Sequence, residues 1–269
     1  MVGRATVNHS KLRGDTVLAF DHQGLDISDP DSVTQIVRTE KPEAVINCAA
    51  WTDVDGCELD AARAYAINSG GPENLAKASR TVGAVFVTIS TDYVFDGRKQ
   101  GFYTQRDDPN PESIYGLAKL EGERKAQLAL ARTVVVRSGF IFGPGGKNFL
   151  STVVDRAKRG EQVKAISDVW GTPTYSLHLA ARLRELAFLD LPGAFHVTNA
   201  GNGATFEEFA RAALEIAGCR NVNIEAVAME SLKRPAPRPR NSRLKCLLSE
   251  AVGLAPLPHW RDGLADFLS

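Results

Sequence analysis

Short apolar runs alternate with longer amphipathic stretches along the first half of the chain. Four runs have the length and composition of buried strands: 16–20, 44–50, 85–89 and 133–137. The stretches between them are long enough for helices, and they cover 29–40, about 58–79, and a segment that begins near Tyr115. Strands that alternate with helices form parallel βαβ units. The pattern therefore predicts an α/β protein with a Rossmann-like doubly wound parallel sheet.

The two ends of the chain depart from this regular alternation. Residues 1–5 have a helix pattern with no strand before them. Beyond Gly146 the pattern predicts helices near 148–159, 177–188 and 206–217, a strand over 162–166, and a loop near 168–174. Such pieces suit a smaller lobe over the cleft of a sheet. We expect a dinucleotide-binding Rossmann domain over 1–145 and a mainly substrate-binding lobe over 146–269.

Charge and cysteine content narrow the choice of partners. The chain of 269 residues has 32 basic and 32 acidic residues, so its charge suggests neither a nucleic acid nor a polybasic membrane contact. No apolar run approaches the roughly 20 residues that span a bilayer, and the first residues show no signal-peptide pattern. Four cysteines lack the spacing of metal ligands: Cys48, Cys57, Cys219 and Cys246. We expect a cytoplasmic protein with reduced thiols, no membrane partner and no metal site.

Tyr115 and Lys119 stand four residues apart at the head of a predicted helix. Residues at this spacing lie on one helix face, so the phenol and the ammonium can point into one site. A phenol has an ordinary pKa of about 10, and a nearby ammonium lowers it by favouring the phenolate. A tyrosine so placed can act as a general acid or base. The same spacing also arises in ordinary amphipathic helices, so the pair alone decides nothing.

Ligands of doubly wound sheets bind beyond the carboxyl ends of the strands. Asp21 follows the run that would be the second Rossmann strand, where a carboxylate bonds an adenosine ribose hydroxyl; an aspartate in a turn is the alternative. The carboxylate would repel a 2′-phosphate, which favours NADH over NADPH. The small residues after Asn47 allow a flat cofactor to approach, or only tight packing. Thr91 offers a hydroxyl near a substrate carbonyl, and the later Tyr115 favours this catalytic role over capping.

Seven stretches in order carry a resemblance to a known family: 47–55, 90–97, 115–119, 146–149, 171–174, 238–244 and 256–260. Together they cover essentially the whole chain. The chain resembles the extended short-chain dehydrogenases and, more narrowly, the dTDP-4-dehydrorhamnose reductase family. The resemblance implies reduction of the C4 ketone of dTDP-4-dehydro-6-deoxy-L-mannose to dTDP-L-rhamnose, with NADH or NADPH as cofactor. It also implies that part of the second half returns to the main sheet, and it allows a homodimer.

The resemblance implies roles for individual residues. Thr91 and Tyr115 would stabilise the charge that hydride arrival leaves on the carbonyl oxygen, and Tyr115 would supply the proton. Lys119 would lower the pKa of Tyr115 and hold the nicotinamide ribose. The cofactor would also contact Val2, Gly3, Asp21, Asp26, Ile27, Ala50, Trp51 and Thr52. The sugar nucleotide would contact Thr91, Asp92, Tyr93 and Phe140.

Two positions bear on the reaction and its substrate. In the related sugar-nucleotide dehydratases an aspartate and a glutamate follow this threonine, but here Asp92 is followed by Tyr93. The second carboxylate is missing, which argues against dehydration and leaves an epimerase open. The family places a tryptophan where Phe140 stands. Phenylalanine keeps an aromatic face and loses the indole donor, so the exact sugar stays open.

The start of the chain departs from the family pattern. It opens on what matches the last glycine of the Gly-rich phosphate turn, Gly3, with the first strand and most of that turn absent. We expect a chain that starts about 10 residues late, the length of one strand and its turn. A genuine short form that has lost the cofactor is the alternative.

The basic, proline-rich segment 233–240 keeps two further alternatives open. Alone it is typical of a solvated linker, whereas the resemblance puts it near the nucleotide diphosphate, where arginines bind phosphate. The methionine adenosyltransferase regulatory subunit shares the Arg-Pro-Arg-Asn pattern of 238–241, so a non-catalytic subunit is a second hypothesis. The intact Thr91, Tyr115 and Lys119 argue against it, because a structural subunit has no chemical need for them.

Overall fold

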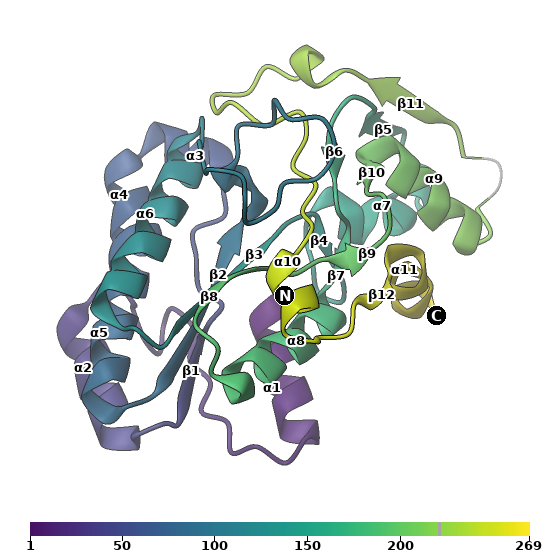
Figure 1. The fold of residues 1–269 in the computed structure, drawn as a ribbon. Coiled ribbons are helices and arrows are strands. Elements are labelled where there is room, and N and C mark those ends of the chain that lie inside the picture. The colour runs from purple at the N-terminus through teal and green to yellow at the C-terminus, as the bar shows by residue number, and fades with distance from the viewer. Residues whose placement is uncertain (220–221) are drawn as a thin grey trace.

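The computed structural model describes residues 1–219 and 222–269, and a four-stranded parallel sheet forms its centre (Figure 1). The strands are β1 (Ala44–Asn47), β2 (Val85–Thr91), β3 (Thr133–Ser138) and β8 (Gly193–His196), in the spatial order β1-β2-β3-β8. Each neighbouring pair is parallel. The predicted α/β class with a parallel central sheet is confirmed.

Helices cover both faces of this sheet (Figure 1). On one face, Phe86 of β2 packs with apolar residues of α2 (Pro30–Glu40), α5 (Gly71–Val82) and α6 (Ile114–Ala129). On the other, Val85 and Val87 pack with residues of α8 (Ser176–Leu189) and α1 (Val2–Leu12). Successive side chains of a strand point to opposite faces. A strand covered on both faces needs apolar residues at every position, which explains the continuous apolar runs.

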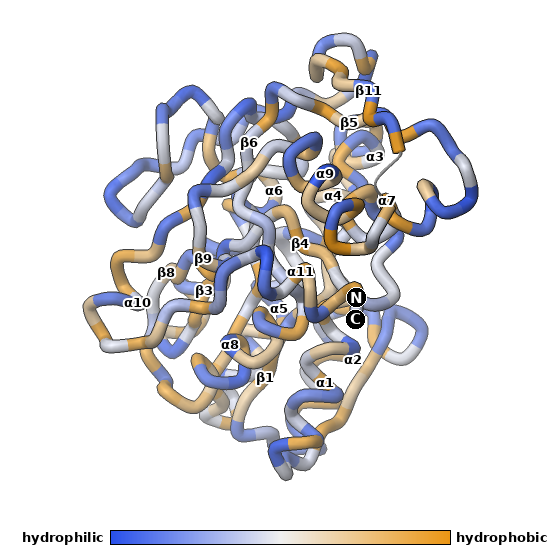
Figure 2. Tube along the Cα trace, turned by 90° about the vertical axis from the view of Figure 1, so that its right-hand side faces the viewer, coloured by the Kyte–Doolittle hydropathy of each residue, from blue (hydrophilic) through white to orange (hydrophobic). Residues whose placement is uncertain are grey.

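The remaining elements pack against the helices of the main sheet or form the smaller lobe and its connections. They are α3 (Val54–Leu59), α4 (Ala61–Tyr65), η1 (Ala66–Gly70), η2 (Asp92–Val94), β4 (Ile141–Phe142), α7 (Phe149–Lys158), β5 (Val163–Ile166), β6 (Trp170–Gly171), β7 (Thr174–Tyr175), β9 (Asn199–Ala200), β10 (Ala204–Thr205), α9 (Phe206–Ile216), β11 (Ile224–Val227), η3 (Met229–Ser231), α10 (Leu247–Ala251), β12 (Leu257–His259) and α11 (Trp260–Leu268). The apolar residues of the smaller lobe form a second core around Phe142, Phe209 and Trp260. Figure 2 shows apolar stretches along interior elements and hydrophilic residues in the outer loops.

The division at residue 145 stays a prediction. Strand β8 and helix α8 come from the second half of the chain and lie in and against the main sheet, in agreement with the expected return. The expected loop over 168–174 contains the two-residue strand β6 and the start of β7. None of the described helices combines the length and the apolar character that crossing a bilayer requires.

The strand predicted over 16–20 is wrong. Within the described residues no strand pairs with this segment, and β1 forms one edge of the sheet. Backbone groups that have no partner strand need water instead, so the segment stays at the surface. Leu18 and Phe20 are accordingly 54% and 50% exposed. The apolar run has the composition of a strand, but a strand forms only where another strand pairs with it.

The single long helix predicted over about 58–79 is also wrong. The segment divides into α3, α4, the π-helical turn η1 and α5. Asp60 interrupts the helix with φ −136° and ψ 77°, and its carboxylate accepts a hydrogen bond from the Arg63 amide at 3.0 Å. Pro72 has no amide hydrogen and fits only the first turn of α5. Single π turns are frequent at functional sites, and this one holds the buried Asn68.

Candidate active site

The predicted catalytic residues meet at the carboxyl ends of β2 and β3. Thr91 ends β2 and lies beside Ser138, the last residue of β3, in the strand register. Helix α6 packs against β2 and β3 and begins at Ile114, so Tyr115 stands in its first turn. This is the edge at which parallel sheets bind ligands.

Local contacts fix the start of α6. The Ser113 side chain accepts a hydrogen bond from the Gly116 amide at 3.2 Å, and Glu58 of α3 accepts one from the Ile114 amide at 3.0 Å. Both contacts satisfy amides that have no partner within the helix. A side chain at Gly116 would overlap the Tyr93 carbonyl oxygen. The glycine therefore lets the first turn of α6 lie directly against the turn η2.

Tyr115 is buried, with 8% of its surface exposed, and its ring meets the edge of the Tyr93 ring at 6.1 Å between centroids. Burial raises the pKa of Tyr115 above its ordinary value, and the nearby Thr91 hydroxyl is the main opposing cause. The expectation that Lys119 lowers this pKa is not met in the structure. Lys119 instead donates to the carbonyl oxygen of Ile89 at 2.6 Å. A neutral phenol is the form of tyrosine that can donate a proton.

Lys119 lies one turn further along α6 and is 4% exposed. Burial lowers the pKa of Lys119 to about 8, while the charges of Glu123 and Cys48 oppose the shift. An ammonium has three donors, and Ile89 is its one hydrogen-bond acceptor among the described residues. The remaining donors can bind the hydroxyls of a ligand.

Thr91 and Asp92 form the other side of the site, and both are buried. The Thr91 hydroxyl donates to Asp92 Oδ1 at 3.1 Å and accepts from the Tyr93 amide at 3.1 Å. Burial raises the pKa of Asp92 to about 6, against the hydroxyls of Ser242 and Thr91, which lower it. Thr91, Tyr115 and Asp92 thus come together in one buried polar cluster.

Asn68 holds the segment that follows β1, and no sequence motif selects it as a functional residue. Its side-chain oxygen accepts from the Trp51 amide at 2.9 Å, and its amide nitrogen donates to the Trp51 carbonyl at 2.9 Å. The Arg63 guanidinium lies 4.5 Å from the centroid of the Trp51 ring. Trp51 and the neighbouring Ala50 and Thr52 are therefore presented in a fixed backbone geometry. The only sign in the sequence is a polar residue that a regular amphipathic helix would not bury.

The other predicted cofactor contacts lie near the start of the chain. Asp21 Oδ1 accepts from the amides of Gln23 and Gly24 at 3.0 Å each, so it does close a turn, and Oδ2 has no hydrogen bond among the described residues. Asp26 accepts from the Ser28 amide and hydroxyl at 2.9 and 2.7 Å. Both carboxylates are exposed.

Three further predicted cofactor contacts pack against the interior of the protein, in contrast to the exposed carboxylates: Val2, Gly3 and Ile27. Val2 packs against the apolar core under α8, and the Gly3 backbone faces Cys48 at the end of β1. The Ile27 side chain is buried, and only a glycine at 71 leaves room for it. A cofactor contact by Ile27 therefore stays a prediction for its backbone rather than its side chain.

Comparison with known proteins decides the family. The model of the RmlD substrate binding domain family matches residues 1–269. The dTDP-4-dehydrorhamnose reductase of Streptomyces griseus is 37% identical over 99% of this chain and 89% of its own length. This chain belongs to the dTDP-4-dehydrorhamnose reductase family. The family predicted from the sequence is confirmed, and with it the class of oxidoreductases.

Two solved reductases have the same fold. That of Clostridium acetobutylicum superposes with a TM-score of 0.94 at 35% identity and covers 99% of this chain and 94% of its own. That of Bacillus anthracis, solved in complex with NADP, superposes with a TM-score of 0.95 at 33% identity and the same coverage. Both agree with the predicted Rossmann-like architecture.

Phe140, expected to face the sugar in this reductase family, lies mostly in the core of the smaller lobe. It is 9% exposed, and its ring centroid is 4.4 Å from that of Phe206. Its φ is 46°, a region that a residue other than glycine occupies at a cost of order 1–3 kcal/mol. Such backbone outliers cluster at functional sites. Contact of Phe140 with a substrate stays a prediction.

A cavity of about 790 Å³ lies between the loop 96–100 and the segment 238–243, and its lining does not include Thr91, Tyr115 or Lys119. Its lining includes five cations and three carboxylates: Arg98, Lys99, Arg238, Arg240, Arg243, Asp96, Glu112 and Asp168. Arg238 binds both oxygens of Asp55 at 2.8 and 2.7 Å, which ties the basic segment to α3.

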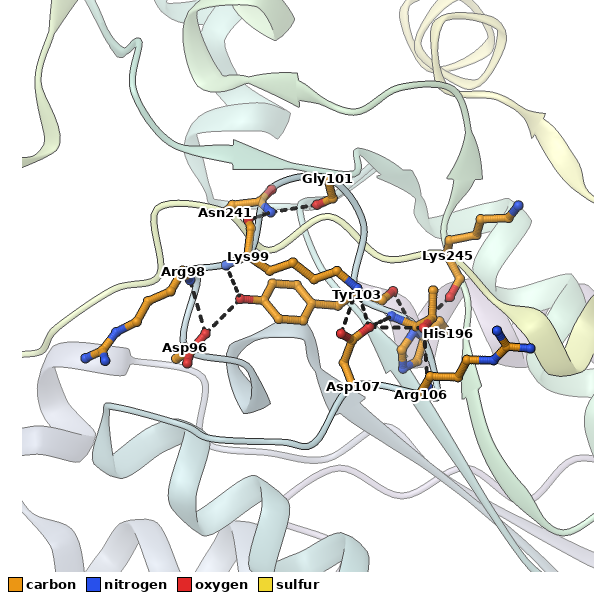
Figure 3. Close-up of polar contacts among 11 residues, drawn as sticks. Asp96, Arg98, Lys99, Gly101, Tyr103, Arg106, Asp107, His196, Asn241 and Lys245 are labelled. Atoms are coloured by element: carbon orange, nitrogen blue, oxygen red, sulfur yellow. Dashed lines mark hydrogen bonds and ion pairs between the residues drawn. The ribbon is translucent and has the colours of Figure 1, made fainter.

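A polar network holds the loop beside this cavity (Figure 3). The Tyr103 hydroxyl donates to Asp96 at 2.8 Å and accepts from the Lys99 amide at 3.0 Å. Asn241 donates to the carbonyls of Lys99 and Gly101 at 2.7 Å each. The motif residue Asn241 therefore fixes the loop that forms one wall of the cavity.

Proposed function

We propose that this chain reduces the C4 ketone of dTDP-4-dehydro-6-deoxy-L-mannose to dTDP-L-rhamnose. The observation that carries the proposal is the buried cluster of Thr91 and a neutral Tyr115 at the carboxyl ends of β2 and β3, one turn from Lys119. Membership of the reductase family supports the same reaction.

The residues of the site fit a nicotinamide cofactor, which supplies the hydride when bound. Lys119 has donors left for the ribose hydroxyls, and Asp21 Oδ2 is open to the adenosine ribose. The segment from Ala50 to Thr52, fixed by Asn68, would lie along the cofactor. The NADP complex of the Bacillus anthracis relative supports a cofactor of this class. The Asp21 carboxylate favours NADH in this chain.

Tyr115 and Thr91 act on the oxygen of the ketone. Negative charge develops there during reduction, and two hydroxyl donors aimed at it stabilise the transition state. Tyr115 then transfers its proton to that oxygen. The raised pKa of Tyr115 keeps the phenol protonated at neutral pH, so the proton is available for this transfer.

Asp92, Tyr93 and Phe140 would contact the sugar nucleotide. Arginines of the segment 233–240 would face its diphosphate, for which the cavity lined by Arg238 and Arg240 offers the cationic surface. Phenylalanine at 140 provides an aromatic face without an indole donor, so the preference among dTDP-4-keto sugars is set by shape at this position.

Oxidation of NADH or NADPH by the purified chain, followed at 340 nm with the dTDP-4-dehydro sugar, tests the proposal. Turnover that depends on the sugar and yields dTDP-rhamnose would support it. Cofactor binding without sugar-dependent oxidation would exclude the reductase and favour the non-catalytic subunit. Interconversion of the sugar without net oxidation of the cofactor would identify an epimerase. A homodimer and a cytoplasmic location also remain proposals, and light scattering tests the first.

A further inference from the structure

Asp92 is a buried carboxyl group with no cation to balance it. It is 3% exposed, and no ion pair involves it among the described residues. Oδ1 accepts from Thr91, while Oδ2 is buried and has no hydrogen-bond partner in the described part of the chain. An ionised carboxylate in such surroundings is costly, because a buried charge needs a partner and a full set of donors.

Among the described residues, the groups that contact Asp92 are neutral. Thr91 and Tyr93 flank it in the chain, Tyr115 faces it from α6, and the Ser242 hydroxyl faces it from the segment after Arg240. At the end of β3, any side chain at Gly139 would overlap the Asp92 carboxyl group. The packing thus leaves room for the carboxyl group itself, and no cation of residues 1–219 or 222–269 pairs with it.

The Thr91 hydroxyl has one hydrogen atom, and Asp92 decides to which acceptor Thr91 donates it. The hydroxyl accepts from the Tyr93 amide, so its own hydrogen is its only means of donation. When Asp92 is ionised, it can only accept, and it takes that hydrogen at 3.1 Å. Thr91 then has nothing to donate to a substrate oxygen. When Asp92 is protonated, its O–H can donate to Thr91, which frees the Thr91 hydrogen.

We propose that Asp92 works as a neutral carboxylic acid that donates a hydrogen bond to Thr91 and so directs the Thr91 hydrogen to the ketone oxygen. Asp92 is then a positioning residue, because it acts on the reacting oxygen through Thr91. The inference rests on the proposed function for the identity of that oxygen. Beyond the proposed function, it assigns a protonation state and a hydrogen-bond direction to Asp92, a residue otherwise expected only to contact the sugar.

The pKa of Asp92, raised to about 6 by burial, supports this assignment. The acid form of Asp92 is then lost as the pH rises through about 6, and kcat/KM should fall about tenfold per pH unit above that point. Lys119, with a pKa lowered to about 8 by burial, gives a separate decline at higher pH. The two declines distinguish the two residues.

The test compares Asp92→Asn and Asp92→Leu with a matched control, Asp60→Asn. Asp60 is an exposed helix N-cap, a position that asparagine also caps well. Asparagine is neutral at every pH and can donate to Thr91, whereas leucine has similar bulk and no donor. We measure kcat/KM from pH 5.5 to 8.5 with one cofactor throughout, since the 2′-phosphate of NADPH itself titrates near 6.

The proposal requires that kcat/KM of Asp92→Asn, taken relative to its own value at pH 5.5, shows no decline near pH 6 and retains the decline near pH 8. Asp92→Leu, which neither takes nor directs the Thr91 hydrogen, should be less active than the wild type below pH 6, show no decline near pH 6 and keep its thermal unfolding profile, and Asp60→Asn should match the wild type. An even loss in Asp92→Asn at all pH values, with the wild-type decline still present, would show that the carboxylate is the working form and overturn the proposal.

A titration without substrate separates this inference from the proposed function. Selectively ¹³C-labelled aspartate gives one carboxyl resonance that disappears in Asp92→Asn. A midpoint at or above about 6 for that resonance supports a neutral Asp92 even if the dTDP sugar proves to be the wrong substrate. A midpoint below about 4, the ordinary value for aspartate, overturns the inference whatever the enzyme reduces.

Discussion

The Arg137 guanidinium binds the Glu123 carboxylate through two nitrogens inside the molecule, at 3.0 Å from Nε and 2.7 Å from Nη2. The side chains are 9% and 4% exposed. Glu123 stands one helical turn after Lys119 on α6, and Arg137 lies in the central strand β3. The pair therefore connects the helix that carries Tyr115 and Lys119 to the middle of the sheet.

Replacing Glu123 by Gln should destabilise the protein by about 3–5 kcal/mol, because Arg137 would keep a buried charge with no partner. Denaturant unfolding measures the loss. The matched control is Asp190→Asn, which removes the carboxylate from the exposed Arg132–Asp190 pair, where about 0–1 kcal/mol is expected. Equal effects in the two variants would show that Glu123 is better solvated than its burial implies.

Replacing Tyr115 by Phe should lower kcat by about 10²–10⁴, since the proton donor is lost and the ring is kept. Cofactor affinity, measured by fluorescence titration, should stay within a few fold. Tyr65→Phe removes a phenol from the same apolar cluster and is the matched control. Retained turnover in Tyr115→Phe would remove this residue as the proton donor.

The strands predicted correctly from the sequence include those that are buried on both faces. Apolar runs at β2 and β3 are buried on both faces, so local composition is sufficient to identify them. The run at 16–20 has a similar composition, but a strand also depends on a neighbour elsewhere in the chain. The helix expected over 58–79 has a continuous pattern, and its breaks come from Asp60, Pro72 and a π turn.

The placement of Tyr115 and Lys119 one turn apart on one helix was predictable because the Tyr-x-x-x-Lys spacing has a direct geometric meaning. The pKa of Tyr115 and the hydrogen bond of Lys119 were not predictable from the sequence. The pKa of Tyr115 is raised because the residue is buried, and Lys119 binds the Ile89 carbonyl of β2, which no local pattern could indicate. The same holds for Asn68, whose role comes from a contact with Trp51 in a distant loop.

Replacing Gly116 by Ala should displace the first turn of α6, because the added methyl group would overlap the Tyr93 carbonyl oxygen. Overpacking of this kind costs about 1–3 kcal/mol. Activity should fall by more than stability alone explains, since Tyr115 moves with the helix. The control is Gly70→Ala, where the nearest atom, the Tyr65 carbonyl oxygen, is 3.9 Å away. Unchanged activity in Gly116→Ala would show that the turn η2 yields instead.

His196 should make the protein sensitive to acid. It ends β8, next to the network of Tyr103 (Figure 3), and its Nδ1 faces the carbonyls of Lys245 and Tyr103 at 3.0 and 3.3 Å. Burial, with the charge of Arg137, lowers the pKa of His196 to about 4. The unfolded chain binds this proton near pH 6.5, so the unfolding free energy should decrease as the pH falls from about 6.5 to 4.

His196→Asn keeps a donor close to the position of Nδ1 and has no proton to gain, so its stability should depend less on pH over this range. His22→Gln, at an exposed position, should keep the wild-type dependence. Urea unfolding at half-unit steps of pH measures all three proteins. Because one group contributes at most one proton, the wild type should lose up to about 1.4 kcal/mol per pH unit more than His196→Asn. Parallel curves for the wild type and His196→Asn would mean that water reaches Nε2 and that His196 titrates normally.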